Sequence, residues 1–444
     1  MRLIYFDRSI LFALLLRCWQ TAAGAVSLIM ITAFFSADLQ GFYYTFSSLL
    51  GLQAFVELGL YIVVLVLASQ EWSKLSLDDS RRIVGDDIAA SRLASLVRFV
   101  AKWYFVASAV FAFGVGIAGH AFLSGSGNTH VEWGWPWWTV VALATCQLWL
   151  MPVLTLLEGC NQVAEINRFR FFQAFAESLA LWCLLIAGAG LWAASGPLAV
   201  KVISSVAFLS IRYRRFFASL WAFPISDSID WKRDIWPMQW RLAAQGAVNY
   251  LVFSLFTPLM FKFHGPAVAG RMGMTLQIIS VIQMISVIWV QTKLPSFGML
   301  AAQRNFAELD KVWLRAAKIS FLVQVVGSIS AMSVLFAIHE LELDIATRVL
   351  DIFPTALFLV AFTLFQIPGY QAAYLRAHAK EPFTMLGVFG GLINGGLVFV
   401  LGSRFGPSGA AIGFLATVIL VMVPFGTLIW KRRRTEWQST SPQI

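Results

Sequence analysis

The chain alternates between long apolar runs and short polar segments. A helix needs about 20 apolar residues to cross the hydrocarbon core of a bilayer. Runs of spanning length lie at residues 10–36, 41–69, 103–124, 136–157, 171–193, 196–211, 242–262, 268–292, 317–338, 350–374, 384–402 and 409–430. Because a helix satisfies its own backbone hydrogen bonds in lipid, this pattern predicts an all-α polytopic membrane protein of about twelve transmembrane helices.

Composition and charge supply an orientation. Hydrophobic residues make up 59% of the 444 positions and charged residues 13%, which excludes an ordinary soluble domain. With the N-terminus inside, 27 of the 33 Lys and Arg residues fall in cytoplasmic segments. Four lie outside, namely Lys262, Arg271, Arg348 and Arg404. The positive-inside rule therefore explains the basic balance without nucleic acid, and it predicts a multi-pass protein with both termini cytoplasmic.

The longest internal loop near the midpoint, at residues 212–237, divides the predicted helices into two sets of six. The predicted bundles are therefore 1–225 and 226–444. Residues match at an offset of 224: Arg17 with Arg241, Gly41 with Gly265, and Gln53 with Gln277. With an even number of helices in each half, the two bundles are predicted to form a parallel repeat about a pseudo-two-fold axis. Transporters built in this way bind substrate between their halves.

An acidic residue lies inside the second apolar run. Glu57 is near the middle of residues 41–69, and a charge facing lipid at that depth costs at least about 2.5 kcal/mol. The nearest cation along the chain is Arg17, inside the preceding run. Two interpretations stay open: a buried pair that orients the first two helices, or groups that bind substrate or couple an ion.

The seventh run carries a polar stripe. Arg241, Gln245 and Asn249 recur every four residues and so share one helix face, which is typical of a cavity lining rather than of a lipid contact. The sequence has no Ser/His/Asp set, no phosphate-binding loop and no metal-ligand spacing. We therefore expect neither an enzyme, nor a metal site, nor an ATP-driven motor.

Three regions carry a family resemblance. They read GFYYTFSSLLGLQAFVELGLYIVV from residue 41, GRMGMTLQI with WVQTKLPSFGMLAAQRNFAELDKVW from residue 270, and YLRAHAKEPF from residue 374. Together they resemble bacterial polysaccharide-biosynthesis membrane proteins, the Wzx-like flippases of lipid-linked oligosaccharides. These belong to the multidrug/oligosaccharidyl-lipid/polysaccharide exporter (MOP) superfamily.

The resemblance implies two six-helix bundles around a cleft, alternating access, and a cationic cavity for a glycan linked by diphosphate to a polyprenyl carrier. In this sequence Arg17 and Arg241 are the residues placed to attract the diphosphate. Gln53, Gln245, Asn249 and Gln277 are candidate substrate contacts, and Glu57 is the candidate for coupling to H⁺ or Na⁺. No other cofactor is expected.

The predicted function is thus a flippase of the bacterial inner membrane. Its expected partners are the lipid-linked glycan, membrane lipids and polysaccharide assembly machinery. Three alternatives stay open: a cation-coupled exporter of drugs or small molecules on the same fold, a membrane glycosyltransferase or polymerase, and a non-transporting structural partner of a glycan assembly complex.

The topology is testable by cysteine labelling in intact cells. Cysteines introduced at Ser126 and Arg404 should react with a membrane-impermeant thiol reagent, whereas those at Asp86 and Arg304 should not, because the positive-inside rule puts the latter in the cytoplasm. Labelling at position 86 in intact cells would overturn the whole arrangement.

Overall fold

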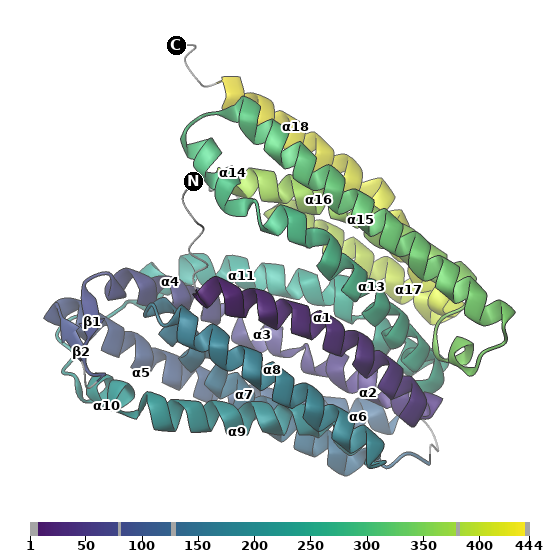
Figure 1. Cartoon of the computed structure of the whole chain (residues 1–444), viewed down its shortest axis with the longest axis horizontal. Coiled ribbons are helices and arrows are strands. Elements are labelled where there is room, and N and C mark those ends of the chain that lie inside the picture. The colour runs from purple at the N-terminus through teal and green to yellow at the C-terminus, as the bar shows by residue number, and fades with distance from the viewer. Residues whose placement is uncertain (1–7, 79–80, 126–129, 379–381, 440–444) are drawn as a thin grey trace. The chain divides into compact units, whose positions relative to one another are not determined.

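The computed structural model describes residues 8–78, 81–125, 130–378 and 382–439. Helices make up almost all of this part of the chain (Figure 1). The predicted all-α polytopic class is therefore confirmed. Ser126, one of the expected external labelling sites, lies outside the described residues.

The described residues of the first half form ten α-helices and one small hairpin. The helices are α1 (Arg8–Phe34), α2 (Ala37–Leu50), α3 (Gln53–Glu57), α4 (Leu60–Trp72), α5 (Asp87–Val110), α6 (Gly116–Ser124), α7 (Gly134–Gly159), α8 (Val163–Ile186), α9 (Ser195–Arg212) and α10 (Arg214–Ala222). A π-helical turn joins α5 to α6, and a 3-10 turn precedes α9. Strands β1 (Leu75–Leu77) and β2 (Ile83–Gly85) pair antiparallel, with Ser76 opposite Val84.

The second half is helical throughout its described elements. They are α11 (Trp236–Asn249), α12 (Phe256–His264), α13 (Pro266–Gln291), α14 (Leu294–Ala302), α15 (Phe306–Glu340), α16 (Ile352–Arg376), α17 (Thr384–Thr417) and α18 (Val423–Ser439). π-helical turns precede α11, join α11 to α12 and join α17 to α18. A 3-10 turn at Asp344–Arg348 lies between α15 and α16.

The described helices account for the twelve predicted spans. Nine are long and apolar enough to cross a membrane, or eleven if each of two bent pairs is one span. The bent pairs are Ala37–Glu57 with Leu60–Trp72, and Trp231–Ser254 with Phe256–His264. The segment Thr384–Trp437 covers two predicted runs and kinks between them at Gly406. Counted as two spans, it brings the total to twelve.

The described chain forms two compact units. The first comprises Met1–Leu39 and Phe46–Ala247, and the second comprises Gln40–Thr45 and Val248–Ile444. This division differs from bundles of 1–225 and 226–444 in two places, because most of α11 packs with the first unit and residues 40–45, inside α2, pack with the second. The side chain of Gln40 shows why: its Nε2 donates to the carbonyls of Gly270, at 2.9 Å, and Arg348, at 3.0 Å.

In the first unit, α1 packs along α8 (Figure 1). Tryptophans supply polar contacts in this otherwise apolar interface, because an indole N–H needs a partner away from water. Trp182 Nε1 donates to Ser27 Oγ at 2.9 Å, and Trp19 Nε1 lies 3.3 Å from Ser178 Oγ. The side chain of Ile29 is 64% exposed, as expected for a helix face that contacts lipid.

In the second unit, the kink of α17 has a local cause. Gly406 has φ 62° and ψ −147°, a conformation that only glycine adopts without strain. Pro407 follows, and a residue before proline is disfavoured in the α region. The two limbs then approach closely, so that a Cβ added at Gly409 would lie 2.1 Å from the carbonyl oxygen of Leu401.

The close approach of Gly409 to Leu401 leads to a prediction about stability. Gly409→Ala should lower the Tm of the purified protein, because overpacking of a core typically costs about 1–3 kcal/mol. Gly396→Ala, in the same helix with no atom within 4 Å of the added Cβ, is the matched control and should leave the Tm unchanged or raise it, since Ala favours helix over Gly. Equal Tm values for the two variants would contradict the close packing at the kink.

Candidate functional site

Glu57 lies where the second span breaks. Helix α3 ends at this residue, and Leu58 and Gly59 both have left-handed backbone conformations, with φ 51° and 67°. The helices on either side are bent by 50°. A leucine at positive φ is strained, and such strain persists only where the surrounding packing enforces it.

The carboxyl group of Glu57 is enclosed by protein. The residue is 4% exposed, and its Oε1 has no hydrogen-bond partner among the described residues. None of the ion pairs within the described part of the chain includes Glu57, so the structure describes no pair between Glu57 and Arg17. The hydroxyl groups of Tyr61 and Tyr104 lie within electrostatic range of the carboxylate. A buried carboxylate in this setting is costly unless it binds a proton or a cation.

Helix α11 covers the break. A Cβ added at Gly59 would lie 2.5 Å from Leu242 Cβ, and one added at Gly246 would lie 3.8 Å from the carbonyl oxygen of Ala54. Only the lack of a side chain at Gly59 allows α11 to approach this closely. Gln53, the first residue of α3, lies one turn before Glu57 on the same helix face. The face of α11 that carries Leu242 and Gly246 therefore packs against the broken span.

The structure distributes the predicted site residues over both units. Arg17, Gln53, Glu57, Arg241 and Gln245 belong to the first unit, and Asn249 and Gln277 belong to the second. Arg17, Arg241, Asn249 and Gln277 are exposed, whereas Gln53 and Gln245 are half-buried. The guanidinium of Arg241 lies over the ring of Trp240, with its carbon 5.7 Å from the ring centre. The predicted repeat pairs the uninterrupted α1 with the segment 231–264, which bends by 47°.

The second unit contains a cavity that the sequence analysis did not identify as a site. Its volume is about 770 Å³, and it lies between α13, α14 and α16. Its polar lining residues are Ser280, Gln283, Gln291, Gln366, Tyr370 and Arg376. The sequence signal was the set of polar residues in the eighth and tenth apolar runs. Because these residues come from separate runs, their convergence depends on helix packing.

A buried hydrogen-bond network forms one wall of this cavity. Gln366 Nε2 donates to Gln324 Oε1 at 2.6 Å. Gln366 Oε1 accepts from Ser286 Oγ at 3.0 Å and from the hydroxyl of Tyr370. Ser320 Oγ donates to the carbonyl of Ser286 at 2.7 Å. These contacts link α13, α15 and α16, and a satisfied polar network of this kind fixes the relative positions of helices.

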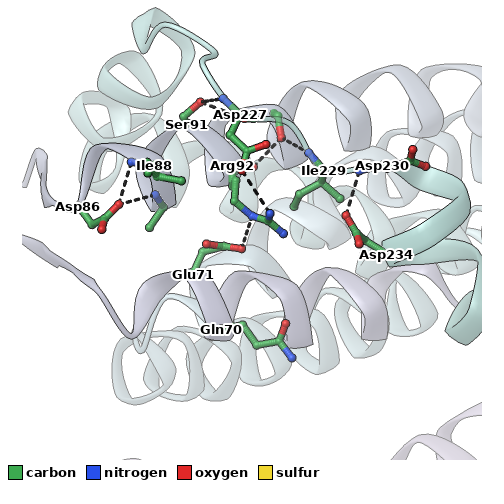
Figure 2. A network of polar contacts seen from close by, with 12 residues as sticks. Gln70, Glu71, Asp86, Ile88, Ser91, Arg92, Asp227, Ile229, Asp230 and Asp234 are labelled. Atoms are coloured by element: carbon green, nitrogen blue, oxygen red, sulfur yellow. Dashed lines mark hydrogen bonds and ion pairs between the residues drawn. The ribbon is translucent and has the colours of Figure 1, made fainter.

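The segment that precedes α11 is bound to α5 by a second network (Figure 2). Arg92 donates to Glu71 Oε1 at 2.8 Å and to Asp227 Oδ2 at 3.3 Å. Ser91 Oγ accepts from the backbone N–H groups of Ser226, at 2.7 Å, and Asp227, at 2.9 Å. The same hydroxyl donates to the carbonyl of Asp227 at 3.0 Å. A single serine thus holds two successive residues of the connecting segment.

The network continues toward α11. Ser95 Oγ accepts from the N–H of Ile229 at 3.0 Å. Asp230 caps the following helical turn by accepting from Lys232 N at 2.8 Å and Arg233 N at 3.2 Å. On α5, the N–H groups of Ala89 and Ile88 hold the pKa of the Asp86 carboxyl below its usual range. Both ends of the segment are therefore anchored, and its anchors set where α11 begins.

No group of three or more His, Cys, Asp or Glu residues in the described part of the chain is arranged to hold a metal ion. No protein-family model matches the sequence, and no curated protein matches it.

Solved transporter structures do share the fold. An inward-facing multidrug resistance MATE family transporter of the MOP superfamily superposes with a TM-score of 0.62 at 14% identity, covering 94% of this chain and 100% of its own. Lipid II flippase MurJ in an inward closed conformation gives a TM-score of 0.70 at 10% identity, covering 97% and 90%. A MOP superfamily transporter from Pyrococcus furiosus gives 0.59 at 14% identity, covering 98% and 96%. The chain therefore has the fold of MOP superfamily transporters over nearly its whole length.

The environment of Glu57 makes a second stability prediction. Glu57→Gln should leave the Tm of the purified protein unchanged or raise it, because the substitution removes a buried charge that has no described ion pair. Glu165→Gln is the contrasting variant: its carboxylate accepts from Arg81, Arg212 and Tyr213, and its loss should lower the Tm. A large drop in Tm for Glu57→Gln alone would show that the carboxylate has a structural partner.

Proposed function

We propose that this protein is a flippase that moves a polyprenyl-diphosphate-linked oligosaccharide across the bacterial inner membrane during polysaccharide biosynthesis. In this proposal both termini are cytoplasmic, transport proceeds by alternating access, and the chain is not an enzyme. The polar head of the substrate crosses through protein while the polyprenyl tail remains in lipid. Polysaccharide assembly machinery is the expected partner.

The observation that carries the proposal is the lining of the cavity in the second unit. The amide side chains of Gln283 and Gln291 line it, next to the hydrogen-bonded Gln366 and Tyr370 of its wall. Amides both donate and accept hydrogen bonds, and the ring of Phe365 adds an apolar surface in the same cavity. This combination matches a sugar, whose hydroxyls need such partners while its ring faces pack on aromatic groups.

A basic residue in the same cavity is suited to bind the diphosphate of the proposed substrate. Arg376 also lines the cavity, and a guanidinium binds phosphate oxygens through two parallel hydrogen bonds. Arg17 and Arg241 belong to the first unit, and each is proposed to attract the diphosphate during transport. Gln53, Gln245, Asn249 and Gln277 are proposed to contact the glycan.

Glu57 is proposed to couple transport to an ion. A carboxyl group at a strained helix break, enclosed and without a described ion pair, is suited to bind H⁺ or Na⁺ in one conformation and release it in another. Rearrangement at Leu58 and Gly59 would move α4 relative to α3. In this proposal, binding of the cation at Glu57 changes the angle between α3 and α4 in the second span.

An exporter of drugs or other small molecules is the alternative that one observation favours. The cavity of the second unit also presents Met284, Val287, Leu294 and Phe365, and flexible apolar side chains of this kind accept varied hydrophobic ligands. A glycan flippase and a drug exporter would use the same cavity and the same coupling ion. They are distinguished by which compound accumulates in cells that lack the protein, the lipid-linked glycan or the drug.

A deletion strain tests the proposed function. Without the protein, lipid-linked glycan should accumulate on the cytoplasmic leaflet, and the wild-type chain should clear it. Arg17→Gln with Arg241→Gln should slow clearance by more than about tenfold, because charge-assisted hydrogen bonds of about 1.5–3 kcal/mol are lost. The control Arg404→Gln removes a basic residue outside the proposed path. Drug sensitivity without glycan accumulation would favour the exporter instead.

A further inference from the structure

We propose that the first unit contains a binding site for one anionic phospholipid, with an acyl chain in an apolar cavity and the phosphate on Arg214. The site is distinct from the cavity of the second unit and does not depend on the proposed substrate, although Tyr104 both lines it and lies near Glu57. The cavity has a volume of about 410 Å³ and lies between α5, α7, α9 and α10. It belongs entirely to the first unit.

The lining of this cavity is suited to a hydrocarbon chain. Its walls are formed by aliphatic side chains such as Val100, Val153 and Leu209 and by aromatic ones such as Phe217. The hydroxyl of Ser210 in the lining donates to the carbonyl of Val206 in its own helix, at 2.6 Å, and so offers little to a polar ligand. Apolar cavities of this kind take up apolar ligands rather than water.

The space has an identifiable origin in α7. Pro152 lies inside this helix and lines the cavity. A proline in a helix interior removes one backbone hydrogen bond and bends the helix. Pro152 is therefore the feature of the α7 sequence that favours a gap at this position.

A single cation lies at the cavity edge. Arg214 is exposed and lines the cavity, and no ion pair among the described residues includes it. Two other arginines of this region have partners within the protein: Arg212 contacts Glu165 at 3.2 Å, and Arg98 donates to the carbonyls of Trp221 and Phe223 at 2.8 Å. Arg214 is the arginine that lines the cavity and is therefore placed to bind an anion there.

The rim resembles a membrane interface. Helix α10 buries Phe216 and Leu220 and exposes Trp221, which is 56% exposed and lines the cavity. Amphipathic helices with tryptophan and arginine lie at the level of the lipid headgroups. The positive-inside rule puts this end of the unit on the cytoplasmic side, where anionic lipids attract basic pockets between helices. Apolar walls and one rim cation together match a phospholipid chain and its phosphate.

The occupant would support the segment that leads to α11. Helix α10 contacts α5, and the chain beyond α10 is the segment that Ser91, Arg92 and Ser95 hold (Figure 2). A lipid against Phe217 and Trp221 fills the space beneath α10. Its loss should therefore destabilise the first unit.

Native mass spectrometry of the delipidated full-length protein tests the site, with phosphatidylglycerol and phosphatidylethanolamine as the two probes. We expect one retained phosphatidylglycerol whose affinity falls about tenfold in Arg214→Gln, as for loss of one charge-assisted contact. Arg215→Gln is the matched control, because this exposed neighbour does not line the cavity. Arg214→Lys should retain binding.

A cavity-filling variant, Val153→Phe, should abolish retention of phosphatidylglycerol and of phosphatidylethanolamine alike. If this variant does not fold, the phosphatidylglycerol affinities of Arg214→Gln and Arg215→Gln still test the proposed site. Equal binding by these two variants would overturn the proposal, since it would mean that a diffuse basic surface holds the lipid. Displacement of phosphatidylglycerol by an equimolar polyprenyl phosphate would overturn it too, in favour of the carrier lipid. Absence of glycan accumulation in the deletion strain would contradict the proposed function, whereas this site is decided by the lipid-binding measurements alone.

Discussion

The shortage of hydrogen-bond partners in hydrocarbon is the constraint on which this structure depends. Backbone N–H and C=O groups that leave a helix inside the bilayer must find partners in protein. The described spans accordingly depart from the α-helix at a few places, each with a specific local chemistry. Gly406 before Pro407 bends α17, and Leu58 with Gly59 breaks the second span. Elsewhere, π-helical turns extend a helix without ending it.

The two buried polar clusters respond to this constraint in different ways. Gln366 has partners from three other residues, Gln324, Ser286 and Tyr370, so its amide is satisfied and joins three helices. Glu57 is enclosed to a similar degree, but one of its oxygens has no described partner. A satisfied network stabilises one arrangement, whereas an unsatisfied carboxyl group favours whichever arrangement gives it a proton or cation. The first is suited to a scaffold and the second to a switch.

Some basic residues are bound within the protein, and another lines a cavity. Arg92 and Arg98 are engaged by carboxylates and carbonyls that hold the segment before α11. They therefore do more than orient the chain in the membrane. Arg214 lies beside an apolar cavity and takes part in no described ion pair. The orientation signal in the sequence thus includes residues with separate structural and ligand-binding roles.

The sequence by itself determined the fold class and the number of spans, because apolar length and basic loops are local properties of the chain. It also identified Glu57 as a buried charge, since no acidic residue at that depth can face lipid. The tertiary structure alone decided that α11 packs over Gly59 and that Gln40 bonds to Gly270. It also brought Gln283 and Gln366, from separate spans, into one cavity. Contacts between distant segments depend on helix rotation and on side-chain volume, and a one-dimensional pattern of apolar runs specifies neither.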